Sequence, residues 1–495
     1  VTGGQTCALP NSDAMSSGVW ENIYNGLLRT NEKRELIGDL AQDWSVSADN
    51  LTITFRIRQG IKWHDGVKFT AQDVKFTYDT IMHADYTGVR AKDFKVVQSI
   101  TCPDDYTLVM KLSSVDASLL SKLTIGVIPK HIFAGHPIAQ LREHPASRKP
   151  IGTGPFKLKE WVSGQYIVLD RNPDYFWSGN EPYLEQVRFR FYTDTQATVA
   201  ALQAGDIDYM GAIPVDEIDF IKQNYATKYS FHDTKGNGYW YIGMKQDNPI
   251  FSNKNVRQAL AYGLDRTNIV SALYKGYGTV INADKPISAG WAYNPNLNTY
   301  AFNTEKAKQL LAAAGWNKVG SDGIRTNAAG ERLSFTLISA SGNQTRENLL
   351  QIIKNQWNAI GVEAKIELFE ISVYYDKLDA GDFEIYQWGW NLGLDPDNFI
   401  FWHSTSGFDE KGILQGYNDV GFSNKRVDEL IEKARGTFNQ EIRRQCYWEI
   451  QEILNEELPY VFLYSIDGVA ALNKRVKGDL WSPMGRVFIE LWHVN

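Results

Sequence analysis

The spacing of apolar side chains predicts the first elements of this chain. Apolar residues at every second position predict two short strands between residues 44 and 57, and a third strand is predicted at residues 61–63. Thr70 has the signature of a helix N-cap, because Asp73 stands three residues later in the position of a capping box. We expect a small sheet with helices packed on one face.

A second region begins at residues 152–156, where two glycines and a proline interrupt the pattern. Strands are predicted between residues 156 and 192, followed by a helix at 195–203 that ends at Gly205. Strands that alternate with helices are typical of an α/β lobe, so parallel pairing is expected here.

Helical periodicity strengthens in the second half of the chain. Asp265, Thr304 and Ser423 are predicted to cap helices, and a last long helix is predicted at residues 440–457. Between them, residues 333–368 have the strand, helix and strand pattern of a βαβ unit, whose crossover should be right-handed.

The most informative stretch is residues 383–403, which is rich in aromatic side chains. It begins as an alternating, half-buried strand, reaches Gly389 and Trp390, and continues into a loop that contains Asp395, Pro396 and Asp397. Aromatic rings, a strand end and carboxylates in one short segment are a common lining for a polar ligand with apolar parts. The alternative is a strand and turn whose tryptophans belong to the core.

Composition narrows the class of protein. A chain of 495 residues is too long for one ordinary core, so two or more lobes are expected. The net charge of −7, without a run of Lys and Arg, argues against a nucleic-acid or anionic-membrane surface. Aromatic residues make up 13% of the chain, which is usual where ligands are held by flat faces but is also compatible with a large core.

Targeting signals and cysteines bear on the compartment. No apolar run reaches the ~18 residues that a membrane crossing needs, so the protein is either cytosolic or has had a targeting segment removed. Cys446 has helical spacing with apolar neighbours and is expected to be a core thiol. Cys7 and Cys102 either form a disulfide in an oxidising compartment or stay as two lone thiols.

Catalytic signatures are absent from the sequence. It contains no phosphate-binding P-loop, no Gly-x-Ser-x-Gly, no His-Glu-x-x-His and no Cys-x-x-Cys. A metal trio of His131, His136 and His144 is conceivable, as is a glycosidase-like pair of Asp206 and Asp208, but solvated loop and strand-end side chains explain both. We therefore expect a protein that is not an enzyme, with a hydrolase as the alternative from a different class.

A series of short motifs stands in order along nearly the whole chain. The motifs are Leu-Ala-Gln-Asp-Trp at 40–44, Phe-Thr-Ala-Gln-Asp-Val at 69–74, Gly-Thr-Gly-Pro-Phe at 152–156, Arg-Asn-Pro-Asp-Tyr at 171–175, Ala-Leu-Gln-Ala-Gly-Asp-Ile-Asp at 201–208, Val-Arg-Gln-Ala-Leu at 256–260 with Asp-Arg at 265–266, and Glu-Lys-Ala at 305–307 with Ala-Gly at 314–315. Such a series is more specific than any single motif. It resembles the oligopeptide- and dipeptide-binding proteins that feed bacterial ABC importers.

The resemblance implies an α/β fold of the two-lobed periplasmic-binding-protein type, in which hinged lobes close like jaws and an extra small domain is inserted in the first lobe. The strands at 239–244 and 461–465 would be the hinges. In this chain the first lobe would be residues 1–28, 152–232 and 461–495, the insertion 29–151, and the second lobe 233–460.

The same resemblance implies a function and its partners. The protein would capture extended oligopeptides between its lobes and deliver them to a membrane permease, as a monomer without a cofactor. It would be extracytoplasmic, either periplasmic or a cell-surface lipoprotein, with a signal segment absent from this chain. Binders of oligosaccharide, nickel or heme with the same fold are the alternatives, because fold alone does not identify the ligand.

Ligand contacts also follow from the resemblance. In this family the strand-end stretch forms part of the wall along which an extended peptide is paired, and an aspartate about three residues after the tryptophan binds the peptide's ammonium group. That position is Gly393 here, so either Asp395 takes over the role or the cleft is roomier and backbone pairing dominates. The predicted contacts are Trp388, Gly389, Trp390, Asn391, Asp395, Tyr464, Asp13 and Met15 in the loop 12–15, with Tyr24 in support.

Overall fold

The chain folds into two compact units in a computed structural model, which describes residues 18–86, 88, 90, 93–177, 182–483 and 485–494. The first unit comprises Val1–His232, Gly436–Phe438 and Val469–Asn495, and the second comprises Asp233–Arg435 and Asn439–Gly468. Division of the first unit into a lobe and an inserted small domain stays a prediction. The candidate residues Asp13 and Met15, and also Cys7, lie outside the described residues.

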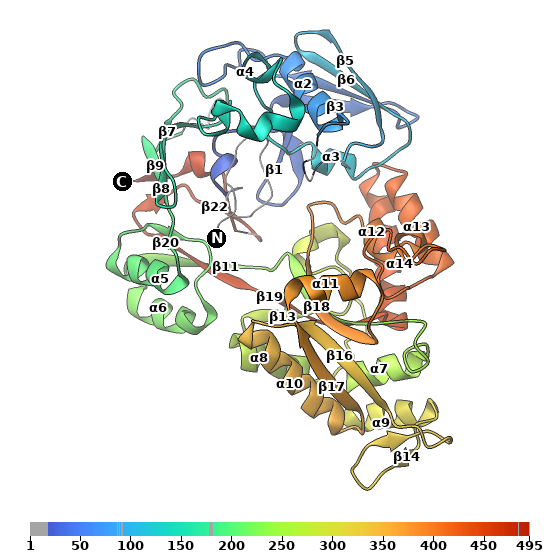
Figure 1. Cartoon of the computed structure of the whole chain (residues 1–495). Helices are drawn as coiled ribbons and strands as arrows, with labels where there is room; N and C mark the ends of the chain where they lie inside the picture. Colours follow the sequence, from blue (N-terminus) through green and yellow to red (C-terminus); the bar gives the residue numbers. More distant parts are fainter. Residues whose placement is uncertain are drawn as a thin grey trace. The chain divides into compact units, whose positions relative to one another are not determined.

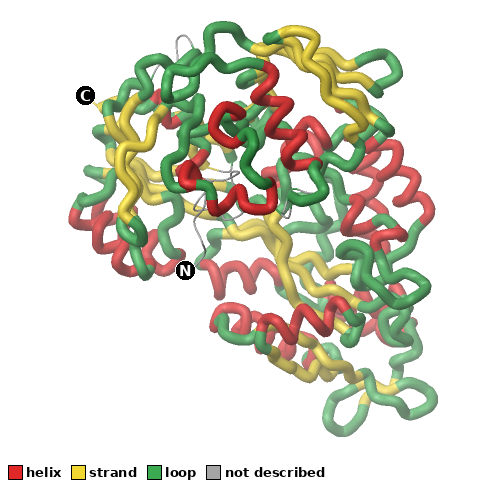
Figure 2. The backbone as a smooth tube through the Cα atoms, turned by 45° about the horizontal axis from the view of Figure 1, so that its top comes forward, coloured by secondary structure: helices red, strands yellow, loops and turns green. Residues whose placement is uncertain are grey.

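The first unit contains a four-stranded antiparallel sheet against which helix α2 packs (Figure 2). The predicted capping box is confirmed, because Thr70 accepts a hydrogen bond from the Gln72 amide and the Asp73 carboxylate accepts one from the Thr70 amide. The sheet order is β3 (Ala41–Val46), β4 (Thr52–Ile57), β6 (Thr107–Leu112) and β5 (Val97–Asp104), and α2 is Ala71–Met82, with short helices α3 at Leu119–Lys122 and α4 at Lys130–Phe133.

The first unit also contains two three-stranded sheets (Figure 1). One consists of β7 (Phe156–Val162), β8 (Tyr166–Arg171) and β9 (Gln186–Arg190). The other has the order β10 (Tyr209–Met210), β20 (Gly468–Asn473) and β11 (Tyr229–Thr234), with helices α5 (Thr195–Ala204) and α6 (Ile218–Tyr225). Short paired strands are β1 (Leu28–Thr30) with β2 (Leu36–Gly38), β21 (Val476–Lys477) with β24 (His493–Val494), and β22 (Leu480–Ser482) with β23 (Gly485–Val487).

Two sequence predictions for this unit are wrong. The strand predicted at residues 61–63 is a single bridge between Lys62 and Lys68, since the chain turns at Gly66 before a ladder can form. The parallel pairing predicted between residues 156 and 192 is antiparallel, because β7 and β8 are joined by a hairpin turn too short for a parallel crossover.

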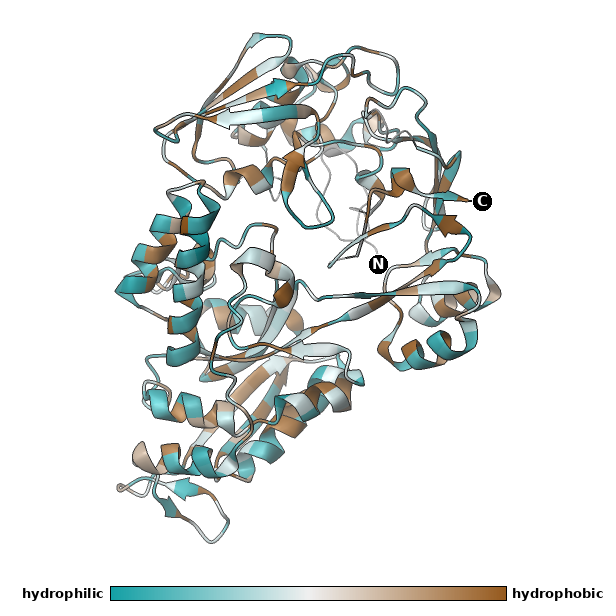
Figure 3. Cartoon of the chain, turned by 180° about the vertical axis from the view of Figure 1, so that it is seen from behind, coloured by the Kyte–Doolittle hydropathy of each residue, from teal (hydrophilic) through white to brown (hydrophobic). Residues whose placement is uncertain are grey.

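The second unit is built on a six-stranded mixed sheet whose strands carry much of the apolar sequence (Figure 3). The predicted βαβ unit is confirmed, since β16 and β17 run parallel on either side of α10 in the chain. The sheet order is β13 (Gly278–Val280), β19 (Tyr460–Ile466), β12 (Gly238–Met244), β18 (Ile385–Asn391), β16 (Ser334–Ala340) and β17 (Glu363–Phe369), with a separate hairpin of β14 (Lys318–Val319) and β15 (Arg325–Thr326).

Helices pack on this sheet and on one another, and α8 lies beside α10 (Figure 1). The predicted cap at Asp265 is confirmed, but α9 is capped by Asn303 and not by Thr304. At the start of α13 it is Asn424, and not Ser423, whose side chain accepts the Val427 amide. The helices are α7 (Lys254–Tyr262), α8 (Arg266–Tyr274), α9 (Thr304–Ala313), α10 (Gln344–Asn358), α11 (Ile371–Asp379), α12 (Phe399–Trp402), α13 (Lys425–Arg435) and α14 (Gln440–Glu457).

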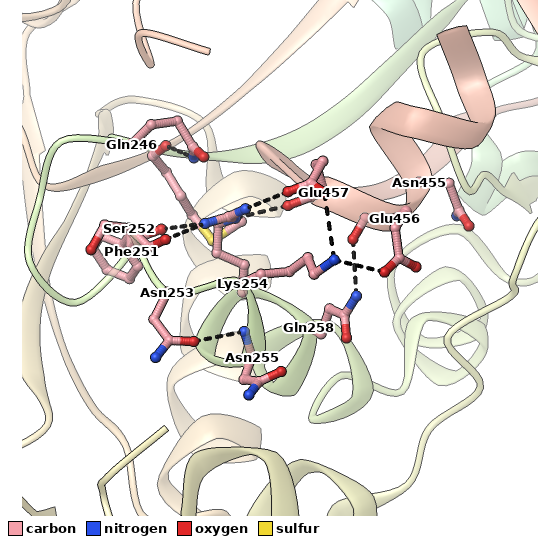
Figure 4. Close-up of polar contacts among 12 residues, drawn as sticks. Gln246, Phe251, Ser252, Asn253, Lys254, Asn255, Gln258, Asn455, Glu456 and Glu457 are labelled. Atoms are coloured by element: carbon pink, nitrogen blue, oxygen red, sulfur yellow. Dashed lines mark hydrogen bonds and ion pairs between the residues drawn. The ribbon is translucent and has the colours of Figure 1, made fainter. Parts of the chain in front are cut away.

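The C-terminus of α14 is held by side chains of α7 (Figure 4). Arg257, which is 4% exposed, donates through Nε to the Glu457 carbonyl at 2.8 Å and through Nη1 to the Phe251 carbonyl at 2.7 Å. Gln258 donates to the Glu456 carbonyl at 2.9 Å. These bonds satisfy carbonyls that the end of a helix leaves without an intrahelical partner, just before the chain enters β19.

The described part of the chain contains no helix that combines the length and apolar character needed to cross a membrane. Cys446 is confirmed as a buried thiol at 2% exposure. Cys102 is half-buried, and its thiol lies 3.4 Å from the Ala71 carbonyl.

Arg257→Ala is expected to lower the free energy of unfolding by about 1–3 kcal/mol, because buried carbonyls lose their donors. Arg257→Lys should recover little of the loss, since an ammonium cannot reproduce the planar fork of the guanidinium. Urea denaturation measures both. The control is Arg444→Ala, which removes an exposed ion pair with Glu441 on α14 and should leave the midpoint unchanged. Equal midpoints for Arg257→Ala and wild type would contradict the assignment.

Candidate functional site: the open edge of strand β18

Strand β18 lies between β12 and β16 in the sheet, but only β12 pairs with it as far as its last residue. Its ladder with β12 runs from Ile385, paired with Met244, to Asn391, paired with Gly238. Its ladder with β16 stops at Tyr386, which is paired with Ile338. Within the described part of the chain, residues 387–391 therefore have a strand on one side only.

The first carbonyl of this open edge is covered by side chains. Ser339 Oγ and the Tyr374 hydroxyl donate to the Gln387 carbonyl at 3.3 and 3.1 Å. Past Gln387, the edge next to Gly389 has no strand beside it in the described sheet. An unpaired edge of this kind can accept an extended chain as an additional strand.

Gly389 lies against the indole of Trp240 on the neighbouring strand β12. A Cβ atom at this position would come within 2.9 Å of Trp240 Cδ2 and Cε3. Only glycine lets the indole lie flat against the strand here. Because side chains alternate along a strand, Trp388 and Trp390 lie on the opposite face, so aromatic rings cover both faces of the open edge.

The two predicted tryptophans have separate surroundings. The Trp390 ring lies 4.9 Å from Tyr417 and 5.1 Å from Phe401. The Trp388 ring lies 5.4 Å from Tyr375 in an edge-to-face contact. Tyr417 and Tyr375 are 47% and 43% exposed, so both groups continue to the surface of the second unit.

The first half of β18 differs from the prediction of a half-buried strand. Ile385, Tyr386 and Gln387 are all fully buried, because the strand is central in the sheet and covered on both faces. Tyr386 donates to the carboxylate of Asp419 at 2.7 Å and lies 3.1 Å from the Tyr241 hydroxyl. A buried polar network thus supports the segment that carries the tryptophans.

Asp419 has an unusual environment for a carboxyl group. It is 4% exposed, and burial raises its pKa to about 7, although the hydrogen bond from Tyr386 acts in the opposite direction. In the first unit, burial likewise raises the pKa of Asp39 to about 6 against the charge of Arg29. Both groups bind a proton more tightly in the folded chain than in the unfolded chain, where the Asp pKa is near 3.8.

Asp395 is already paired inside the second unit. Its Oδ1 accepts from Arg443 Nη2 at 2.6 Å and from the Asp397 amide at 2.9 Å. Arg443 is 7% exposed; burial lowers its pKa, but the charges of Asp395 and Tyr447 outweigh burial and hold the pKa above its usual value. The carboxylate therefore neutralises a buried guanidinium and orders the loop after β18.

Gly393 has free space around it. A Cβ atom built there meets no described atom within 4 Å, and its φ is not in the left-handed region. A side chain is thus compatible with this position.

The remaining predicted contacts are placed as follows. Tyr464 is fully buried on β19, with its hydroxyl 3.3 Å from that of Tyr274. Asn391 is exposed at the end of β18. Tyr24 is buried at 4% exposure in an apolar cluster of the first unit. Their role toward a ligand stays a prediction.

Some residues that surround the open edge had no place in the sequence prediction: Trp240, Arg346, Tyr375 and Tyr417. The run of aromatic residues at 239–241 is the one signal that pointed to Trp240. Arg346 comes from α10 and Tyr417 from a loop after α12, whereas Tyr375 comes from α11, the helix directly before β18. No local pattern marks any of the three. The described residues contain no group of three or more His, Cys, Asp and Glu that could hold a metal ion.

Comparison with known proteins identifies the family. Residues 35–411 match the description "Bacterial extracellular solute-binding proteins, family 5 Middle". The chain belongs to this family of solute-binding proteins. The resemblance found in the sequence and the predicted two-lobed α/β fold class are thereby confirmed.

Relatives of this family 5 chain differ in what their names say they bind. The oligopeptide-binding protein AppA of Bacillus subtilis is 33% identical over 98% of this chain and 88% of its own length. Its structure in complex with a nonapeptide has a TM-score of 0.76 and covers 99% of this chain and 96% of that one. HbpA2 of Haemophilus parasuis has a TM-score of 0.86 at 26% identity, covering 99% and 97%. NikZ of Campylobacter jejuni, in complex with Ni(L-His), has a TM-score of 0.78 at 27% identity, covering 98% and 96%.

Stability is expected to fall as the pH rises from about 4 to about 7, because Asp419 and Asp39 must lose protons that the folded state holds more tightly. Asp419→Asn keeps the hydrogen-bond acceptor for Tyr386 and removes the titration. The variant should lose part of this pH dependence and keep the part due to Asp39.

Urea midpoints at pH 5, 6, 7 and 8 measure this difference. An Asp419→Asn curve parallel to that of the wild type would show that Asp419 does not titrate in this range.

Proposed function

We propose that this chain is the extracytoplasmic solute-binding protein of an ABC importer, and that it binds extended oligopeptides and delivers them to a membrane permease. The observation that carries the proposal is the open edge of β18 past Gln387, with aromatic rings on both of its faces. A peptide has unpaired N–H and C=O groups that must be satisfied when it is buried, and an open strand edge satisfies them without selecting side chains. The relation to AppA supports peptide over the other ligands of the family.

Further parts of the proposal concern architecture and cellular context. The first unit would consist of a lobe and a small domain at residues 29–151, and the segments near 239–244 and 461–465 would act as hinges when the lobes close on a ligand. The protein would act as a monomer, in the periplasm or as a lipoprotein at the cell surface. It would not be an enzyme, which agrees with relatives named as binding proteins.

The wall around the ligand would include Trp388, Gly389, Trp390 and Asn391. Tyr464, Asp13 and Met15 would contribute from other segments. Asp395 is the least suited of the proposed contacts, because its Oδ1 is bonded to Arg443. A carboxylate that already balances a buried guanidinium attracts a ligand's ammonium group less than an unpaired one does. The internal pairing favours a site in which backbone pairing contributes most of the affinity.

A panel of unrelated peptides of several lengths should bind with micromolar or better affinity, about −8 kcal/mol or stronger. Isothermal titration calorimetry measures it, with a labelled peptide incubated in parallel to detect turnover. Binding of only sugars, metal chelates or heme, or hydrolysis of the labelled peptide, would refute the proposal.

Acetylation of a peptide's amino terminus should cost less than about 1.4 kcal/mol, a factor of ten in affinity. Gly393→Asp places a carboxylate where the family's anchor is expected and where a side chain has room. This variant should bind free-amine peptides about three- to tenfold more tightly and acetylated peptides unchanged, as a new charge pair would.

The matched control is Gly393→Asn, which has the same shape without the charge and should not gain affinity. Asp395→Asn is a poorer probe, because it leaves Arg443 buried without its partner and should also reduce stability. A hundredfold loss on acetylation in the wild type, abolished by Asp395→Asn, would show that Asp395 is the anchor after all.

A further inference from the structure

Arg346 lies where strand β16 leaves strand β18. It belongs to the first turn of α10, which follows β16 in the chain, and its Nη1 donates to the carbonyl of Ala340, the last residue of β16, at 3.2 Å. The ladder between β16 and β18 has ended by this point. The guanidinium is therefore next to the open edge described above.

Two tryptophans on opposite faces of β18 both contact this guanidinium. Its carbon lies 4.7 Å from the ring centroid of Trp388 and 5.7 Å from that of Trp240. Trp240 covers Gly389 on one face, and Trp388 lies on the other. The guanidinium thus lies within reach of one indole ring on each face of β18.

Unlike Arg443 and Arg29, the half-buried Arg346 has no carboxylate partner among the described residues. Arg443 is paired with Asp395 at 2.6 Å, and Arg29 is paired with Glu490 at 2.8 Å. Arg346 forms no ion pair with any carboxylate of the described residues, and its Nε is buried without an acceptor. A guanidinium has five N–H donors, and the Ala340 carbonyl accepts from only one of its nitrogens.

The surroundings of Arg346 are rich in hydroxyl groups and poor in negative charge. Its charge acts on four tyrosines, opposing the rise in pKa that burial causes in each: Tyr274, Tyr374, Tyr375 and Tyr464. Tyr464 and Tyr274 also lie hydroxyl to hydroxyl at 3.3 Å. These groups can donate hydrogen bonds to an oxyanion but cannot neutralise a cation.

We propose that Arg346 binds a carboxylate of the ligand and makes the site selective for ligands with a negative charge at this point. The proposal rests on the proposed function, since the ligand would be a peptide paired along β18. Such a peptide would pair with β18 beyond the point where β16 ends. Its chain end, or a nearby side chain, would then meet the guanidinium of Arg346, which lies at the end of β16. A carboxylate there can accept two N–H groups of the fork.

A ligand carboxylate has two possible sources, the peptide's C-terminus and an Asp or Glu side chain. A series of nonapeptides, the length bound by AppA, distinguishes them. One glutamate is moved through the sequence on a neutral background, and each peptide is compared with its glutamine twin. A second pair differs only in a free or amidated C-terminus. Dissociation constants are measured by calorimetry at low and at physiological salt.

In the wild type, one glutamate position or the free C-terminus should bind about tenfold or more tightly than its neutral twin. In Arg346→Gln this ratio should fall to about twofold or less, because only the charged peptide loses an ionic partner. Arg346→Lys should keep part of the ratio, because it restores the charge but not the planar fork.

Arg188→Gln is the matched control. Arg188 also lies over an aromatic ring, 3.9 Å from that of Tyr166 in the first unit, and its substitution changes the net charge by the same amount. It should leave the ratio unchanged.

Three results would overturn the proposal. Wild-type protein that binds charged and neutral twins equally would show that Arg346 reads no carboxylate, although peptide binding itself would stand. A preference that persists in Arg346→Gln would assign the carboxylate to another cation. If no peptide binds at all, the proposed function fails and this inference fails with it.

Discussion

The candidate site depends on the unequal pairing of strand β18. β12 pairs with it through all seven residues of the strand, whereas β16 pairs with it only as far as Tyr386. The long ladder fixes the backbone of residues 387–391, and the short one leaves their other edge without a neighbour among the described strands. A rigid strand with an open edge is prepared to accept another chain, because the protein loses little conformational freedom on binding.

The side chains around this edge follow from the same arrangement. Central placement in the sheet buries Tyr386, and its bond to Asp419 joins the strand to a hydroxyl network beneath Trp390. Gly389 is needed because Trp240 occupies the space of a side chain, whereas Gly393 has open space around it. The two glycines are four positions apart but differ in their surroundings. Close packing excludes a side chain at Gly389, whereas a side chain would have room at Gly393.

Charges in the second unit are mostly balanced internally. Asp395 pairs with Arg443, and the fully buried Asp284 pairs with Lys285 at 2.7 Å. Arg346 is an exception beside the open edge. Because named relatives with this fold are described in complex with a nonapeptide or with Ni(L-His), the choice of ligand must depend on such individual side chains and not on the fold.

Much of the fold and part of the site could be predicted from the sequence. The capping box at Thr70, the βαβ unit, the last long helix and the strand that ends in Trp388 to Asn391 all depend on local spacing and on residues that favour helix ends or strands. The order of motifs along the chain was enough to indicate the family. Each of these features depends on residues that are close together in the sequence, or on the order of motifs along it. The sequence alone is therefore enough to predict them.

Only the tertiary structure decided which groups meet. The antiparallel pairing of β7, β8 and β9 depends on turn geometry, and full burial of the start of β18 depends on its neighbours in the sheet. Arg443 is 48 residues from Asp395, and Arg346 on α10 is separated from Trp388 on β18 by strand β17 and helix α11, yet these pairs are in contact. Charge pairing and its absence are properties of distances in space, which apolar periodicity does not specify; this is why Asp395 was a candidate anchor from sequence and Arg346 was not.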